Sequence, residues 1–247
     1  LQNWLAYQQS LPFNGSFAYQ LDLALAERDS QLAISTDLQG VSIDLPAPLA
    51  KQADEKITTS WHMTLDGAER HYRLVHGTRL NGLFAVSERG SQPLRGELVL
   101  GGRAARLPAG DGLRIRGDVT RLQVPDWLAA LERYAPPTGE NQGDTLQELQ
   151  LDIGQLEGFG IPLEQAQLGV WPSAGGWLVQ LVSKQAKGNV RIPAAGPLSV
   201  DFERLQLPAL ESDGGAVQTA DGLSPADVPA MQVSIAQLVL GPDTLGD

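Results

Sequence analysis

Apolar and polar side chains alternate along most of this chain. In SFAYQLDLALA, which begins at Ser16, aromatic residues and leucines occupy every second position from Phe17 to Leu25. A period of two is typical of a β-strand with one dry face, because successive side chains point to opposite sides of a strand. The pattern therefore restricts the chain to a fold built mainly of half-buried strands.

The same alternation recurs between clear turn signals, in ITTSWHMTL, GLRIRGDV, LQELQLDIG, GWLVQLV, LSVDFERLQL and MQVSIAQLVL. Asp66-Gly67, Gly101-Gly102 and Gly175-Gly176 separate such segments. Short glycine turns typically connect antiparallel neighbours. We therefore predict a mainly β protein dominated by an antiparallel meander.

The segment VPDWLAALERYAPP has a helical pattern instead. Asp126 is expected to cap its first turn, and Trp127, Leu131 and Tyr134 recur at the spacing of one helix face. A second, weaker helical pattern covers residues 1–11. One or two short helices are therefore expected beside the strands.

Two stretches, residues 136–145 and 211–229, are rich in Gly, Pro and Asp and predict loops. The first loop suggests a division of the chain. Residues 1–135 would form one β segment that ends in the short helix, and residues 146–247 a second β segment that continues the same sheet.

Composition excludes several classes of function. The chain of 247 residues has 29 acidic and 18 basic residues and a formal net charge of -11, without a basic cluster, so nucleic acid is not an expected partner. It has no cysteine, which excludes thiol catalysis, thiolate metal sites and disulfides and is compatible with export. No apolar run approaches the roughly 18 residues that span a bilayer. Because the sequence also begins in mid-phrase, we interpret it as a piece of a longer protein whose anchor lies elsewhere.

Motifs for catalysis are missing from the sequence. It contains no phosphate-binding glycine loop, nucleophile elbow or metalloprotease helix. We expect His62, His71 and His76 at the surface, with the last two on opposite faces of a strand and so poorly placed for a shared metal. Asp201 and Glu203 share a strand parity that would suit a glycosidase, but paired acids are ordinary in so acidic a chain. No enzyme activity, metal or cofactor is expected.

The stretch STDLQGVSIDLPAPLAK, which begins at Ser35, predicts a strand with an abrupt end. Residues 40–45 alternate as a strand does. Pro46 and Pro48 then remove backbone donors and end the pairing, and Lys51 is expected in solvent.

This stretch resembles a recurring phrase of the YhdP family of AsmA-like proteins. Four further phrases agree in order and together cover most of residues 36–246: GLRIRGDVTRLQVPDWLAAL, LEGFGIPLEQAQLGVWPSAGGWLVQLVSKQAKGNVRIP, PLSVDFERLQLP and SPADVPAMQVSIAQLVLGPDTLG. The chain thus resembles a segment of that family over nearly its full length.

The resemblance implies a fragment of a Gram-negative envelope protein that is anchored in the inner membrane and has its bulk in the periplasm. Such proteins are thought to move phospholipid toward the outer membrane along an open hydrophobic groove of strongly curved β-sheet. The implied partners are phospholipid acyl chains and adjoining segments of the same long chain, with membrane contact through regions absent from this sequence. Gly82, Gly96, Gly117 and Gly169 are expected to permit the curvature.

The apolar parity of the strands is then expected to line the groove. The residues that we predict for this lining are Phe17, Tyr19, Leu21, Leu23, Ile34, Trp61, Met63, Phe84, Leu98, Ile115, Leu151, Trp177, Val179, Leu181, Val200 and Phe202. The residues alone leave an alternative open, a closed barrel or sandwich whose dry faces pack on one another and which serves as a non-catalytic scaffold of the envelope. A carbohydrate-active enzyme is a third, weaker possibility.

Overall fold

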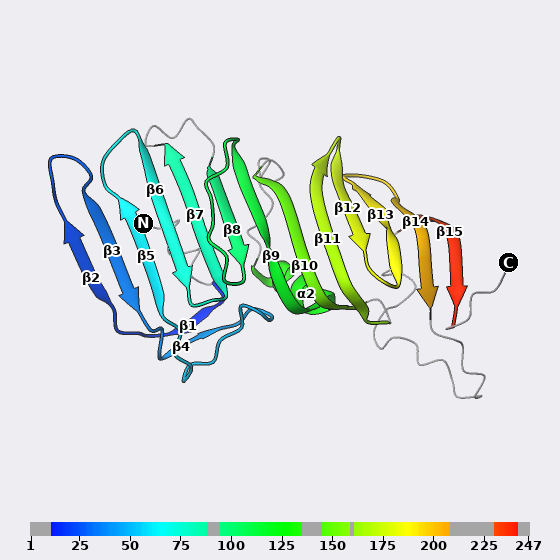
Figure 1. The fold of residues 1–247 in the computed structure, drawn as a ribbon, viewed down its shortest axis with the longest axis horizontal. Helices are drawn as coiled ribbons and strands as arrows, with labels where there is room; N and C mark the ends of the chain where they lie inside the picture. The colour runs from blue at the N-terminus through cyan, green and yellow to red at the C-terminus, as the bar shows by residue number, and fades with distance from the viewer. Residues whose placement is uncertain (1–10, 88–93, 135–144, 159–160, 208–229, 242–247) are drawn as a thin grey trace.

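Thirteen strands form one sheet in the computed structural model, which describes residues 11–87, 94–134, 145–158, 161–207 and 230–241. Figure 1 shows them side by side along the long axis of the molecule, from β2 at one end to β15 at the other. Their bounds are β2 (Gln20–Ala24), β3 (Gln31–Thr36), β5 (Thr59–Thr64), β6 (Glu69–His76), β7 (Leu80–Ser87), β8 (Arg95–Leu100), β9 (Gly112–Gln123), β10 (Leu146–Glu157), β11 (Leu163–Ser173), β12 (Gly176–Val182), β13 (Ala186–Pro193), β14 (Leu198–Leu207) and β15 (Met231–Leu240).

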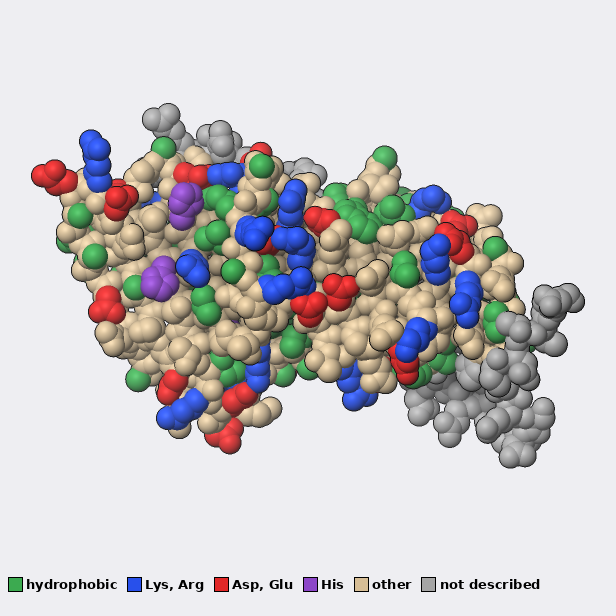
Figure 2. All heavy atoms as spheres, viewed as in Figure 1, with side chains coloured by type: hydrophobic (Ala, Val, Ile, Leu, Met, Phe, Trp, Pro, Cys, Tyr) green, Lys and Arg blue, Asp and Glu red, His purple; other side chains and the backbone are tan. Residues whose placement is uncertain are grey.

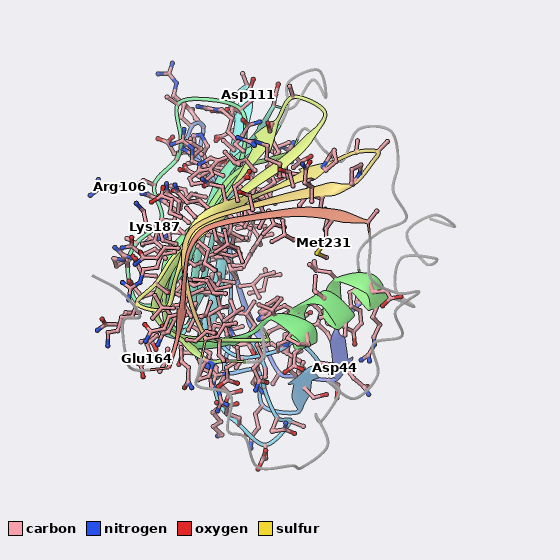
Figure 3. The ribbon with its side chains drawn as sticks, turned by 90° about the vertical axis from the view of Figure 1, so that its right-hand side faces the viewer. Asp44, Arg106, Asp111, Glu164, Lys187 and Met231 are labelled. Carbon is pink, nitrogen blue, oxygen red and sulfur yellow. The ribbon has the colours of Figure 1, made fainter. Side chains whose placement is uncertain are left out.

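Three further elements lie near one end of the strands. β1 (Phe13–Gly15) and β4 (Val41–Ile43) pair with each other as a separate two-stranded sheet, and α2 (Val124–Tyr134) follows β9. Figure 3 shows α2 and this small sheet on the side toward which the large sheet curves.

The predicted meander is confirmed for most of the sheet, in which strands that follow one another in sequence pair antiparallel. The pairs β8–β9, β9–β10 and β14–β15 are parallel instead. Parallel neighbours need a connection that returns to the starting end of the sheet. The predicted helix has this role, because α2 lies in the return from β9 to β10.

The sheet bends sharply where the alternation within the strands breaks. In β9, Val119 and Leu122 are both buried although two exposed residues separate them. The paired strand β10 repeats this spacing with Ile153 and Leu156. A spacing of three positions reverses the parity of a strand, so a straight sheet would send these side chains to opposite faces. Because the backbone turns here, the apolar side chains stay on the inner side.

Two further strands, β11 and β14, have irregularities of their own. In β11, buried Leu163 and Ala166 have the same spacing, and Gln165 between them has a positive φ of 50°. In β14 a register shift opposite Lys187 leaves Glu203 without a directly paired residue. These irregularities on β9, β10, β11 and β14 bend the strands and account for the strong curvature in Figure 3. Among the described strands β2 and β15 remain as edges, so the sheet is open and not closed into a barrel.

The four glycines expected to permit the curvature do not lie at these irregularities. The Phe84 ring covers Gly82 and Gly96, and the Trp171 ring covers Gly169, so that a Cβ at any of these positions would collide with a ring. The lack of a side chain at these three positions makes room for aromatic packing, and a part of the four glycines in the curvature stays a prediction.

The buried core lies between the centre of the sheet and α2. It contains Leu100, Val119, Leu122, Leu151, Ile153, Leu156, Leu163, Ala166, Leu181 and Ala186. Val124 and Trp127 of α2 pack against this cluster. The predicted helix is confirmed, but it begins at Val124, so Asp126 lies within its first turn and not before it.

Lys51 is buried, contrary to the expectation of a solvent position. Its side chain is only 2% exposed, and Nζ donates hydrogen bonds to the carbonyl oxygens of Leu38 (2.7 Å), Val41 (2.8 Å) and Gln52 (3.0 Å). After the prolines the chain folds back and Lys51 pairs with Ile43 through both backbone groups. The strand ending therefore continues into a compact turn built around one ammonium group.

The proline segment also holds the helix. Trp127 Nε1 donates to the carbonyl oxygen of Ala47 at 3.2 Å, and Asp44 accepts hydrogen bonds from Arg133 Nη1 at 3.0 Å and from the Tyr134 hydroxyl. Residues far apart in sequence thus fix α2 beside β4.

Candidate functional site

One row of directly paired residues crosses the whole sheet and is apolar throughout. Directly paired residues lie on the same face, with Cβ atoms about 5 Å apart. The row, here called the central row, consists of Leu21, Ile34, Trp61, Leu74, Gly82, Leu98, Ile115, Leu149, Val170, Val179, Val190, Val200 and Val233. Every one of the thirteen strands contributes one residue to it.

Two neighbouring rows on the same face extend this surface. Toward one end of the strands a shorter row contains Leu23, Leu32, Met63, Tyr72, Phe84, Gly96 and Leu113. Toward the other end the row contains Thr36, Thr59, His76, Leu80, Leu100, Gly117, Leu151, Leu168, Leu181, Gly188, Phe202 and Ile235. None of the three rows contains Asp, Glu, Lys or Arg.

The opposite face carries the charges. Arg116 pairs with Glu97, Arg191 with Asp201 at 3.4 Å, and Lys187 with Glu203. Figure 2 shows this face, where basic and acidic side chains gather over the central strands. The two acids considered for a glycosidase, Asp201 and Glu203, thus bind different cations here.

The apolar face is the concave one. In Figure 3, Arg106, Glu164 and Lys187 lie on the outer side of the sheet, whereas Met231 lies on the inner side of the curve. Met231 is two residues from Val233 in β15 and therefore shares the face of the central row.

Exposure along the concave face is uneven. At the bend, beside α2, Leu156 is 1% and Leu163 2% exposed, so the protein fills its own interior there. At the two sheet edges Leu21 is 50% and Val233 51% exposed. Between these ends every side chain of the central row stays partly exposed, and Gly82 has none. An uncharged surface thus remains accessible along the molecule.

Comparison with protein families fits this architecture. The family model described as YhdP protein matches residues 2–247. The chain belongs to the YhdP family. No curated protein and no solved structure gave a significant match to the chain. Within the part of this YhdP-family chain that the structure describes, no helix is both long and apolar enough to span a membrane.

Most residues that we predicted for the groove lie on this concave face. Those in its three rows are Leu21, Leu23, Ile34, Trp61, Met63, Phe84, Leu98, Ile115, Leu151, Val179, Leu181, Val200 and Phe202. Trp177 is two residues before Val179 in β12 and shares its face. Phe17 and Tyr19 precede β2, and their ring centroids are 6.2 Å apart. The role of all these residues in lipid contact stays a prediction.

The prediction missed several members of the central row. Leu74, Leu149, Val170, Val190 and Val233 belong to it. Each lies in a segment with the same alternation as the predicted residues, so the parity within the strand was a sufficient signal for them.

Aromatic side chains gather in the N-terminal half of the face. The rings of Trp61 and Tyr72 have centroids 5.6 Å apart, and the Phe84 ring covers Gly82 on its own strand and Gly96 on β8. The C-terminal half of the central row is aliphatic instead. The character of the surface therefore changes along the molecule while its lack of charge does not.

His76 is a polar inclusion in this face, and its expected surface position was wrong. It is 6% exposed, its Nδ1 lies 2.8 Å from Thr59 Oγ1, and Nε2 has no hydrogen-bond partner. Burial, followed by the nearby charges of Arg79 and Lys51, lowers the pKa of His76. The neutral imidazole is therefore the stable form.

The other two histidines follow their predictions. His62 and His71 are exposed, and His71 lies on the face opposite to His76, with Nε2 3.1 Å from a carboxylate oxygen of Glu69. Across the described ranges, no three His, Cys, Asp or Glu side chains are grouped so that they could hold a metal ion.

Proposed function

We propose that this YhdP-family chain is a periplasmic segment of an inner-membrane-anchored protein that conducts phospholipids between the inner and outer membranes. The acyl chains would lie on the concave face, and the adjoining segments of the same long chain would continue the path. The observation that carries this proposal is the central row, which is uncharged on all thirteen strands and has a partly exposed apolar side chain on twelve of them.

Energetics give such a surface a use. Keeping one methylene from water is worth about 0.8 kcal/mol, so a phospholipid with roughly thirty chain carbons faces a gross cost of about 25 kcal/mol in an aqueous gap. A row of similar aliphatic side chains shields the chains at every step. It also offers no single deep trap, because neighbouring positions are chemically alike.

The openness of the sheet supports a conduit over a closed scaffold. A sandwich or barrel would bury its apolar face against another layer, as the residues beside α2 are buried here. The central row keeps partial exposure, and the concave face at the edge strands β2 and β15 is about half exposed. Apolar ligands with flexible chains fit such a surface.

The test places a charge in the row of the full-length protein in its cell envelope. Val179→Asp should strongly reduce the transfer of pulse-labelled phospholipid to the outer membrane, because a carboxylate on the concave face interrupts the apolar path. The matched control is Gln180→Asp, since Gln180 is its exposed neighbour on the opposite face. Leu21→Asp in the same row and Met63→Asp in the shorter row beside it extend the test along the concave face.

Folding of each variant is checked by circular dichroism, and bound phospholipid by native mass spectrometry. The expected result is loss of bound lipid and of transfer in the row variants and neither loss in the control. Folded row variants with unchanged lipid content and unchanged transfer would sink the proposal and favour the scaffold.

A further inference from the structure

Two adjoining hollows lie on the outer, convex side of the sheet, opposite the apolar concave face. The first has a volume of about 450 Å³, and the polar residues that line it are Asp118, Thr120, Asp152, Gln165 and Gln167. The second has a volume of about 480 Å³, and its polar lining residues are Arg103, Arg106, Arg116, Gln150 and Asp152. Because Asp152 lines both, the two hollows form one groove across β9, β10 and β11, here called the outer groove.

The bend of the sheet opens the first hollow. The direct pairing of β10 with β9 and with β11 runs through Ile153 and Gln155 but skips Gly154 between them. The positions opposite, Thr120 and Gln165, are skipped as well. Gly154 has no side chain that could fill the space. The outer side of the bend is therefore hollow where a regular sheet would carry a closed row of side chains.

A buried carboxylate fixes the walls of the second hollow. Glu97 is 2% exposed and accepts hydrogen bonds from Arg116 Nε at 2.8 Å and from the backbone N–H of Arg106 at 2.7 Å. It joins β9 to the connection before it, residues 101–111, and Figure 3 shows Arg106 on the outer side. Arg103 of this connection pairs with Asp118 at 2.7 Å. Contacts within the protein thus position the groove, which reduces the entropy cost of binding a ligand there.

An aromatic ring lies beside the groove. Trp171 follows Val170 of the central row, so its side chain is on the outer side of β11. The ring is partly exposed and covers Gly169, which pairs directly with Gln150. Its Nε1 donates to Glu148 Oε1 at 3.4 Å. The ring is therefore held next to Gln150 at the edge of the second hollow.

The charges around the outer groove balance one another. Three guanidinium groups and three carboxylates belong to it, those of Arg103, Arg106, Arg116, Glu97, Asp118 and Asp152. Figure 2 shows basic and acidic side chains adjoining in the middle of this face. Such a site attracts neither anions nor cations through its net charge, but it presents hydrogen-bond donors and acceptors side by side.

We propose that the outer groove binds a glycan chain of uncharged sugar units. Sugar hydroxyl groups both donate and accept hydrogen bonds, and the groove has acceptors on Asp118 and Asp152 and donors on its arginines and glutamines. A sugar ring also has an apolar face, which the Trp171 ring is placed to cover. The site goes beyond the proposed function, because it gives a second kind of ligand to the face that carries no lipid.

The form of the groove favours a chain of sugars over other occupants. Two adjoining hollows fit several linked units better than one small molecule. A peptide commonly binds a sheet by adding a strand to its edge. The outer groove crosses the faces of β9, β10 and β11, each of which already has a paired strand on both sides.

Calorimetric titration of the full-length protein, purified in a detergent without sugar groups, tests this assignment. The probes are neutral tetrasaccharides of glucose and of N-acetylglucosamine, together with a phosphorylated glucose tetrasaccharide. Saturable binding of at least one neutral probe is expected. Asp152→Ala should weaken it by about tenfold or more, because Asp152 accepts hydrogen bonds in both hollows. Gln150→Ala, a change at a second exposed residue of the groove, should weaken it as well.

The matched control is Asp201→Ala. Asp201 lies on the same outer side, in β14, and does not line either hollow. Its replacement should leave the affinity for the neutral probe unchanged. Circular dichroism checks that each variant is folded.

The outcomes that overturn the proposal are distinct. Binding of no neutral probe contradicts it, and binding of the phosphorylated probe alone makes the arginines an anion site instead. Equal affinities of wild type, Asp152→Ala and Gln150→Ala would place the glycan elsewhere on the protein. Phospholipid content, measured by native mass spectrometry, should be the same in wild type and Asp152→Ala. A failure of the glycan site would therefore leave the proposed lipid path untouched.

Discussion

At the scale of single residues, Lys51 shows how a charge can be buried without an acid. Its ammonium group binds three backbone carbonyl oxygens from the turn around it. Lys51→Met would leave these acceptors without a donor, and we expect the free energy of unfolding to fall by about 2–3 kcal/mol. Denaturant unfolding measures the change.

The matched control for that prediction is Lys56→Met. The Lys56 side chain is 62% exposed and pairs with Asp37 at 3.6 Å, and exposed pairs of this kind contribute little. Equal losses of stability in the two variants would show that the three hydrogen bonds from Lys51 to backbone carbonyl oxygens do not stabilise the turn.

His76 makes stability depend on pH in a direction that its burial sets. Its pKa is lowered in the folded protein, whereas the unfolded chain binds a proton near the ordinary value of about 6.5. The contribution of His76 is therefore complete above that pH and is lost as the pH falls, because the unfolded state then binds the extra proton.

The measurement compares wild type with His76→Gln between pH 7.5 and 5.5. Wild type should lose more unfolding free energy over this range than the variant does, since carboxylates contribute equally to both. Parallel pH profiles would contradict the prediction. His62→Gln is the control, because His62 is exposed and should leave the profile unchanged.

Sequence reasoning failed at these two residues for different reasons. The burial of His76 was readable, since it shares the parity of Tyr72 and Leu74 in β6. The burial of Lys51 was not, because the carbonyl groups that bind it come together only when the chain folds back after Pro48. When backbone carbonyl groups bind a buried charge, the sequence has no pattern of side chains that predicts the burial.

At the scale of elements, Gly117 ties two parallel strands together. It has a φ of 147°, and a Cβ there would lie 2.2 Å from the carbonyl oxygen of Leu100 on β8. Gly117→Ala should lower the free energy of unfolding by about 2–4 kcal/mol, through strain and the forced separation of β8 and β9.

A second glycine provides the comparison in thermal or denaturant unfolding. A Cβ at Gly102, in the connection between the same two strands, meets nothing within 4 Å. Gly102→Ala should change stability by less than about 0.5 kcal/mol. Equal free energies of unfolding in the two alanine variants would show that the close approach of Gly117 to Leu100 does not contribute to stability.

The strands and the helix were predicted from the residues and the strong curvature from the family resemblance, whereas the position of the bend and the parallel pairs were not predicted. Alternation specifies which side chains share a face within each strand, and so it found most of the concave surface. The bend depends on three-position spacings such as Val119 to Leu122 and Ile153 to Leu156. These spacings are visible in the sequence, but on their own they indicate only that the alternation stops, as it does at the end of a strand. Parallel pairing of β9 with both neighbours depends on the course of two connections, residues 101–111 before β9 and the return through α2 after it, which no local pattern states.

At the scale of the whole molecule, each strand of the large sheet pairs only with its neighbours in the order of the chain. Stability is then distributed as in a repeat protein, where each unit depends on the units beside it. Strands β9–β11 have the buried core and α2 against them, while β2 has exposed side chains throughout and a neighbour on one side only.

Hydrogen exchange should therefore be graded along the molecule. Backbone amides of β9, β10 and β11 are expected to exchange most slowly, and those of β2 and β15 at least a hundredfold faster, because edge strands open locally. Mass spectrometry of peptides from each strand measures this gradient. Uniform protection from exchange in all strands from β2 to β15 would contradict the prediction that each strand is stabilised only by the strands beside it.

The direction of the strands also determines how the molecule would respond to a pull. The strands stand across the long axis in Figure 1, so the hydrogen bonds between them run along it. A force between the two ends of the molecule would load these bonds in an opening mode, without the resistance of strands sliding past one another. Under tension the fold would yield by peeling single strands from its ends, and the strands around α2 would be the last to separate.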